Sequence, residues 1–399
     1  MKIGIITATY TPIPAVLGGA TETMMTHLIN VNDTLNENHF TIFEYYNSDA
    51  LKASKSYKNT DFVFFHERKI DKLNLLLYRF LRKISCHKIY LRFPYLIYCA
   101  NYIRKNNFDA IIIEGNWHHA LHLRNLISNK IILHMHVDRL NTDLRESPSI
   151  IASVDGIFAI SQFCKNKMLE VKNSDTHKIY VVKNTIDTNK FIPKLNGSQN
   201  PNFFGEKYGL QPKDKIVCFC GRLVENKGIL HLIKAMKYVN KSNVKLLVLG
   251  SSRYKNSKTT PFMRLLQNEA QSLGNRVVFA GYISQDLLPY YIQSCFISVV
   301  PSICNEAAGN VILESLSCGI PVITTTQGGI PEYADNSACD LIEYNNDFVY
   351  KLSKSIMKFV DDVDYYESKR KCARQVALKY DKHLYYQNFC SCIQDIISK

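Results

Sequence analysis

The chain has 399 residues, 46% of them hydrophobic, which is enough to form two hydrophobic cores of ordinary size. No apolar run approaches the ~18 residues that a transmembrane helix needs, which excludes a helical integral membrane protein. The formal net charge is +14, and the 12 cysteines include no C-x-x-C pair, so we interpret them as reduced thiols rather than zinc ligands. We therefore expect a large cytoplasmic enzyme.

Runs typical of strands alternate with runs typical of helices along the chain. The predicted strands are 3–8, 40–46, 62–66, 110–114, 131–136, 156–160, 179–182, 216–220, 245–250, 277–280, 296–300 and 321–325. Helices are expected between and after them, near 20–30, 120–127, 163–171, 229–239, 263–273, 287–294, 308–318 and 363–397. This alternation predicts the α/β class, with two doubly wound parallel sheets and a ligand cleft at the carboxyl ends of their strands.

A segment rich in Pro, Gly, Asn and Lys, residues 193–214, separates the two predicted sheets, and we interpret it as a hinge region. The N-terminal domain is therefore placed at residues 1–192. The second domain is placed at residues 193–375, and a C-terminal helix follows at 376–399.

Lysines and arginines are concentrated between residues 68 and 105. This stretch contains ten of them and a single acidic residue, Asp71. The ten are Arg68, Lys69, Lys72, Arg79, Arg82, Lys83, Lys88, Arg92, Arg104 and Lys105. Bulky apolar residues alternate with these charges, a pattern that fits an amphipathic helix on an anionic membrane surface. An ordinary solvated helix face is the first alternative and a nucleic-acid surface the second. We favour the membrane surface and expect no nucleic-acid partner.

The strongest pattern lies in residues 298–331, where a predicted strand, a polar loop, a helix and a second strand follow one another. Glu306 lies in the loop, and Glu314 lies on the helix, on the same face as Asn310. The helix is otherwise apolar, so a carboxylate there is costly unless it is hydrogen-bonded, and ligand hydroxyl groups would suit it. The backbone N–H groups around Gly309 and Asn310 open the helix, and such an end attracts phosphate.

A second pattern, residues 221–228 (G-R-L-V-E-N-K-G), follows a buried strand and opens a helix. Arg222 and Lys227 are two cations at a place where anion sites form. A departing nucleoside diphosphate gains negative charge, which two fixed cations and a helix N-terminus stabilise without a metal. Alone, such a basic pair in a loop is as often solvent-exposed as functional.

The first half offers weaker signals. Gly18 and Gly19 follow the first strand and let the backbone approach a ligand, although a plain turn explains them equally well. His134 and His136 end a strand and face the same side of it, whereas His118 and His119 are interpreted as a helix start. We expect no metal at these histidines, because no carboxylate stands at a spacing such as H-E-x-x-H.

Taken together, P-S…E-x7-E followed by L-S-C-G-I-P-V-I, and G-R-x4-K-G, resemble glycosyltransferase family 4, whose members are retaining enzymes of the GT-B fold. The resemblance implies a donor-binding second domain, an acceptor-binding first domain and a terminal helix that returns to the first domain. It implies catalytic roles for His136, Arg222, Lys227 and Glu306, with His134 as the alternative to His136. The implied donor-binding residues are Gly18, Gly19, Gly221, Arg222, Lys227, Glu306, Ala307, Ala308, Gly309, Asn310 and Glu314. Ala308 departs from the phenylalanine that many members carry, and Thr185 departs from the glycine of N-G-V-D.

The implied reaction moves a sugar from a nucleoside-diphosphate sugar to a hydroxyl group of a saccharide or lipid-linked acceptor, in cell-surface polysaccharide or lipopolysaccharide synthesis. No cofactor and no metal are expected, because Asp362-Val363-Asp364 lies between two helical stretches and we interpret it as solvated acids. The protein is expected at the inner face of the membrane. A nucleotide-sugar epimerase of the same fold and a catalytically silent nucleotide-sugar-binding subunit are the alternatives.

Overall fold

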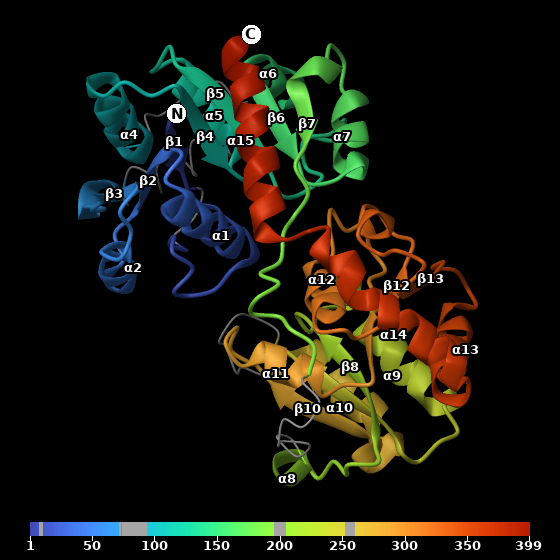
Figure 1. The fold of residues 1–399 in the computed structure, drawn as a ribbon. Helices are drawn as coiled ribbons and strands as arrows, with labels where there is room; N and C mark the ends of the chain where they lie inside the picture. The colour runs from blue at the N-terminus through green and yellow to red at the C-terminus, as the bar shows by residue number, and fades with distance from the viewer. Residues whose placement is uncertain (8–10, 72, 74–93, 195–204, 252–259) are drawn as a thin grey trace. The chain divides into compact units, whose positions relative to one another are not determined.

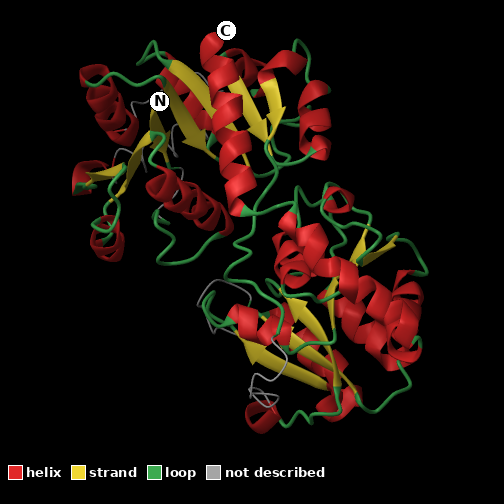
Figure 2. Cartoon of the chain, viewed as in Figure 1, coloured by secondary structure: helices red, strands yellow, loops and turns green. Residues whose placement is uncertain are grey.

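The computed structural model describes residues 1–7, 11–71, 73, 94–194, 205–251 and 260–399 (Figure 1). These residues form two compact units, 1–183 with 382–399 and 184–381. In each unit a parallel sheet carries helices on both faces (Figure 2). No helix among the described residues is both long enough and apolar enough to cross a bilayer. The basic stretch predicted as a membrane surface falls largely on residues 72 and 74–93, which lie outside the described residues.

Unit 1 is built on a seven-stranded parallel sheet with the strand order β3-β2-β1-β4-β5-β6-β7. Its strands are β1 (Lys2–Ile6), β2 (His39–Tyr45), β3 (Thr60–Phe65), β4 (Ala110–Glu114), β5 (Lys130–Met135), β6 (Gly156–Ala159) and β7 (Ile179–Val181). Its helices are α1 (Ala20–Leu35), α2 (Ser48–Ser54), α4 (Pro94–Lys105), α5 (Trp117–Arg124), α6 (Ser147–Ala152), α7 (Gln162–Leu169) and α15 (Lys382–Ser398). The strand order reverses at β1, so the carboxyl ends of β1 and β4 flank the position where such folds bind ligands.

Unit 2 is built on a six-stranded parallel sheet with the order β10-β9-β8-β11-β12-β13. Its strands are β8 (Lys215–Cys220), β9 (Val244–Leu249), β10 (Val277–Gly281), β11 (Ile297–Val300), β12 (Val322–Thr325) and β13 (Cys339–Ile342). Its helices are α8 (Gly205–Tyr208), α9 (Ile229–Tyr238), α10 (Pro261–Ala270), α11 (Leu288–Gln293), α12 (Asn310–Ser317), α13 (Phe348–Asp361) and α14 (Val363–Leu378). The order reverses between β8 and β11, the two strands that precede the two motifs of the second half.

The C-terminal helix belongs to the first unit, as predicted. Helix α15 packs beside α1, and Phe389 is fully buried in the core of unit 1. The hydroxyl of Tyr386 donates to Asn32 Oδ1 over 2.8 Å, so a polar contact also ties α15 to α1. The two Rossmann-like units and this returning helix confirm the predicted GT-B architecture.

The observed boundaries differ from those placed on the sequence. Unit 2 begins at Asn184 instead of 193, because the segment after β7 is already bound to unit 2. The Arg374 guanidinium of α14, in unit 2, donates to two carbonyl oxygens of this segment. They belong to Thr188, at 2.7 Å, and Phe191, at 2.6 Å. Within the predicted hinge region, residues 195–204 lie outside the described part of the chain. The predicted helix 363–397 is divided into α14 and α15, with the return to unit 1 between them.

Candidate functional site

The loops that follow β8 and β11 in unit 2 are in direct contact at the carboxyl ends of these strands. Gly228 has φ +69°, and a Cβ atom there would lie 1.8 Å from the carbonyl oxygen of Pro301. The Ile303 N–H donates to the carbonyl oxygen of Asn226 over 3.0 Å, which joins the loops further. Only glycine allows this close approach, so the second glycine of the 221–228 motif, Gly228, lets the two loops meet.

Lys227 and Glu306, one from each loop, form an ion pair in this place. The Lys227 ammonium lies 2.5 Å from Glu306 Oε1, with 24% and 14% of the two side chains exposed. The Ser302 hydroxyl also donates to Glu306 Oε1. The carboxylate is therefore held by a cation and a buried hydroxyl, and its second oxygen has no protein donor among the described residues.

The backbone of Glu306 is fixed as well. Its carbonyl oxygen accepts from the Gly329 N–H over 2.7 Å, and it forms a bridge with Gly328, whose φ is +61°. A Cβ atom on Gly328 would lie 2.4 Å from the Glu306 carbonyl oxygen, so the loop after β12 closes over the Glu306 loop only with glycine. Thr325 Oγ1 in turn donates to the Ser302 carbonyl oxygen over 2.8 Å. A constrained backbone on both sides holds the carboxylate in one place.

Helix α12 begins one residue after its N-cap, Gly309, close to the predicted start at Ala308. Asn310 Oδ1 accepts from Asn184 Nδ2 over 2.7 Å, which positions the first turn. Glu314 is half-buried and makes no hydrogen bond through its side chain to a described residue. Desolvation by burial raises the pKa of Glu314 to about 7. A carboxyl group left without a protein partner here is suited to accept from or donate to a ligand hydroxyl.

The remaining predicted donor residues lie on the same two loops, after β8 and after β11. Arg222 is exposed one residue after Gly221, at the end of β8. Ala307 and Ala308 lie between Glu306 and the N-cap of α12, both half-buried. The structure thus brings the residues that sequence analysis selected in the second half together at one edge of the unit 2 sheet.

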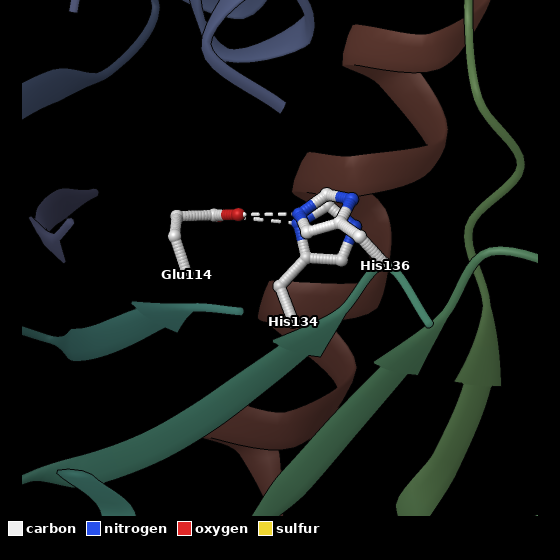
Figure 3. Close-up of side chains that lie close together, drawn as sticks. All are labelled: Glu114, His134 and His136. Atoms are coloured by element: carbon white, nitrogen blue, oxygen red, sulfur yellow. Dashed lines mark hydrogen bonds and ion pairs between the residues drawn. The ribbon is translucent and has the colours of Figure 1, made fainter. Parts of the chain in front are cut away.

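The predicted site residues of the first half lie at the carboxyl ends of strands in unit 1. Gly18 and Gly19 precede α1 with φ values of +80° and +113°, and Gly19 is the N-cap. His134 and His136 lie on the same side at the end of β5, as predicted, and both contact Glu114 of β4 (Figure 3). His136 has 12% of its side chain exposed and His134 has none, so His136 is the more accessible of the two.

Glu114 is the residue that sequence analysis missed. Burial raises the pKa of its carboxyl, but the charges and hydrogen bonds of His134 and His136 outweigh burial and lower the pKa to about 2. Burial, together with the neighbouring His134, lowers the pKa of His136. The only signal in the sequence was an acidic residue ending an apolar strand, A-I-I-I-E, where an unpaired charge is unfavourable.

An open pocket of about 560 Å³ lies in unit 1, between the end of β3 and the first turns of α4. Aromatic rings form part of its wall, and an ion pair between Arg68 and Asp71 lies at one side. The other lining residues are Phe64, Phe65, His66, Pro94, Ile97, Tyr98 and Asn101. The pocket is suited to a ring that offers both an apolar face and polar groups.

Several other sequence interpretations have structural outcomes. Asp362 is the N-cap of α14 and accepts from the Tyr365 N–H over 2.9 Å, so the D-x-D string is a helix start here. His118 and His119 lie in the first turn of α5, as predicted. Ser161 caps α7, and Thr185 Oγ1 donates to the Tyr380 carbonyl oxygen over 2.8 Å, so both have structural roles.

The two parallel sheets and the returning helix form the GT-B fold, and comparison with known proteins agrees. Residues 202–376 match the family model described as glycosyl transferases group 1. An uncharacterised glycosyltransferase of Methanocaldococcus jannaschii is 31% identical over 179 residues, 44% of this chain and 43% of that protein. A capsular polysaccharide biosynthesis glycosyltransferase of Staphylococcus aureus, CapM, is 30% identical over 217 residues, 51% of this chain and 54% of that protein.

These alignments span about half the length of the two relatives. Among solved structures, Anabaena HepE in complex with UDP-glucose superposes with a TM-score of 0.75 at 16% identity, covering 99% of both chains. At that identity the likeness shows the fold, including the N-terminal half that the family model does not cover.

Proposed function

We propose that the protein is a retaining glycosyltransferase that moves a sugar from a nucleoside-diphosphate sugar to a hydroxyl group of a saccharide or lipid-linked acceptor. The observation that carries the proposal is the ion pair of Lys227 and Glu306 in the two joined loops of unit 2. An ammonium has three donors, so Lys227 serves both Glu306 and a donor phosphate. Glu306 has its second oxygen left to accept from sugar hydroxyl groups. In this proposal the Lys227 ammonium lies where the leaving diphosphate gains negative charge, and it stabilises that charge.

In this proposal Arg222 joins Lys227 at the diphosphate, and Glu314 accepts from the ribose. His136, Gly18 and Gly19 contribute from unit 1. The acceptor hydroxyl attacks the sugar from the same face from which the leaving group departs. The departing phosphate oxygen takes the proton of that hydroxyl. No separate general base is then needed. The name of the CapM relative and the aromatic pocket of unit 1 support a saccharide acceptor, in cell-surface polysaccharide or lipopolysaccharide synthesis.

The proposal is tested by screening nucleoside-diphosphate sugars for a thermal shift and then following release of the nucleoside diphosphate. A ligand at 100 times its dissociation constant adds ~2.7 kcal/mol to the free energy of unfolding, which a thermal shift detects. We expect one donor to shift the melting temperature and to be consumed only when an acceptor is present. Isomerisation of the donor without an acceptor would instead show the epimerase, and binding without any turnover would show the silent subunit.

Catalysis is expected to need no added divalent metal, because cationic side chains hold the diphosphate. Dialysed enzyme should turn over equally fast with and without added Mg²⁺ or Mn²⁺. Changing Asp362 and Asp364 to Asn should leave the rate within twofold and the stability nearly unchanged, because asparagine caps a helix as well as aspartate does. A rate that depends on added Mn²⁺ and is lost in the double variant contradicts this mechanism.

We also propose that the basic stretch 68–105 holds the protein on an anionic leaflet at the inner face of the membrane. Each lysine or arginine near such a surface contributes about 1 kcal/mol, and the attraction fades within ~8 Å at physiological salt. The protein should sediment with anionic but not neutral liposomes, and salt should weaken this. Charge reversal at Arg79, Arg82 and Lys83 should release it, while reversal at three exposed lysines of unit 2, Lys234, Lys351 and Lys354, should not. Wild-type protein that stays in the supernatant at low salt rules the surface out.

A further inference from the structure

A second pocket, of about 140 Å³, lies in unit 2 beside α14. It is bordered by the segment that follows β7, by Gln293 at the end of α11 and by Gly319 after α12. Four of its lining side chains are cationic, and none among the described residues is acidic. The four cations are Lys194, Arg370, Lys371 and Arg374, and we call this place the cationic pocket.

The cationic pocket lies away from the two joined loops. Gly319 and Ile320 lead from the end of α12 into β12, so the pocket lies at the amino end of that strand. The joined loops follow the carboxyl ends of β8 and β11, which belong to the same sheet. Because the strands of this sheet are parallel, their amino and carboxyl ends lie at opposite edges of it. The pocket is therefore separate from the loops to which the sugar donor is assigned.

One of the four cations has a structural role. The Arg374 guanidinium donates to the carbonyl oxygen of Ser317 over 2.8 Å, in addition to its two acceptors in the segment after β7. These acceptors are neutral, and no acidic side chain of the described residues pairs with Arg374. A half-buried guanidinium without a counter-charge is unfavourable, and an anion in the pocket would supply that charge.

The other three cations have no such role. Lys194 and Lys371 make no hydrogen bond and no ion pair with a described residue. Arg370 has Glu367 as its one acidic partner in the described part of the chain, at 3.5 Å and with half of the Arg370 side chain exposed, which is a weak surface contact. Arg374 alone holds the segment after β7, so packing does not explain three further cations around the pocket. Because like charges repel, an anion between them lowers the energy of this arrangement.

The end of α12 does not oppose an anion here. Carbonyl oxygens at the C-terminal end of a helix carry partial negative charge when they are left free. In this helix the carbonyl oxygens of residues 314–317 each accept a hydrogen bond. The donors are the N–H groups of residues 318–320 and the Arg374 guanidinium. The charge that remains around the pocket is therefore positive.

We propose that Lys194, Arg370, Lys371 and Arg374 form a binding site for one phosphate group, either of inorganic phosphate or of a small phosphate monoester. Arginine binds phosphate oxygens through its planar fork of N–H donors, and lysine binds them as a point charge. At about 140 Å³ the pocket is smaller than the ~300 Å³ at which pockets begin to enclose drug-sized ligands, which suits a phosphate group better than a nucleotide. The site does not depend on the proposed transferase activity.

The test is a calorimetric titration of the full chain with inorganic phosphate, at an ionic strength held constant with sodium chloride. Since the joined loops are proposed to bind phosphate as well, the titrated protein carries Arg222→Ala and Lys227→Ala. We expect this protein to bind one phosphate per chain. A parallel titration with glycerol 3-phosphate separates the two sources. Tighter binding of glycerol 3-phosphate assigns the site to a monoester, and equal or weaker binding assigns it to the free ion.

Further variants then locate the bound phosphate. Adding Arg370→Gln and Lys371→Gln should weaken binding by about 10–100-fold, the range for losing a hydrogen bond to a charged group. Both side chains are exposed, so the fold should be retained, which circular dichroism checks. The matched control adds Lys234→Gln and Lys351→Gln, which remove two charges from exposed helix positions elsewhere in unit 2, and it should bind as the parent does. The proposal is overturned if the parent binds no phosphate, or if the pocket variant and the control bind it equally well.

Discussion

Replacing Lys227 by alanine is expected to lower turnover by about 10²–10³-fold, the range for removing one donor to transition-state charge. In the structure the ammonium lies 2.5 Å from Glu306, so the variant removes the proposed phosphate contact and leaves Glu306 with Ser302 as its only protein donor among the described residues. The loss should fall mainly on kcat, because the charge on the diphosphate grows as the bond to the sugar breaks. Steady-state kinetics with a fixed acceptor measures both parameters.

The control for this experiment is Lys234→Ala on α9, an exposed lysine outside the two joined loops, which should retain wild-type kinetics. Arg222→Ala should change turnover in the same direction as Lys227→Ala. Both loop variants should keep the wild-type melting temperature within a few degrees, since exposed and half-exposed loop side chains contribute little to stability. Wild-type turnover in Lys227→Ala would remove the assignment of the diphosphate to this loop.

Replacing Phe389 by alanine is expected to cost ~3–5 kcal/mol of unfolding free energy, the range for deleting a buried phenylalanine. Phe389 lies on α15, is fully buried and packs its ring against Phe158, 5.2 Å away between centroids. The cavity would open in unit 1 although the residue is eleventh from the end of the chain, since α15 completes that core. Urea unfolding followed by a probe in unit 1, Trp117, measures the loss.

Leu384→Ala on the same helix is the matched control. Leu384 is 50% exposed, so its truncation should change the free energy by less than ~0.5 kcal/mol. Donor binding to unit 2 should survive in both variants, because α15 belongs to unit 1. Equal and small losses in the two variants would show that the C-terminal helix does not complete the core of unit 1.

Much of the fold was open to prediction because it depends on local patterns. Short apolar runs separated by helix-length segments force a parallel sheet, and every predicted strand is present. The sixth strand of unit 2, β13 (Cys339–Ile342), was not predicted, because it is an edge strand of four residues with an aspartate inside it. In the sequence, so short a strand with an acidic residue cannot be distinguished from a polar loop. The donor-side residues were found for the same local reason, since Lys227, Glu306 and Glu314 stand in short strings around single turns.

The sequence by itself therefore determined the two sheets, the two motif loops of unit 2 and the residue types that the loops present. The tertiary structure decided the ion pair of Lys227 with Glu306, 79 residues apart, and the return of α15 to unit 1. It also decided that Glu114 contacts both His134 and His136, a grouping that no spacing along the chain indicated. The physical reason is the parallel sheet, which places residues in register across strands separated by a whole helix, so that groups distant in sequence come within hydrogen-bonding reach.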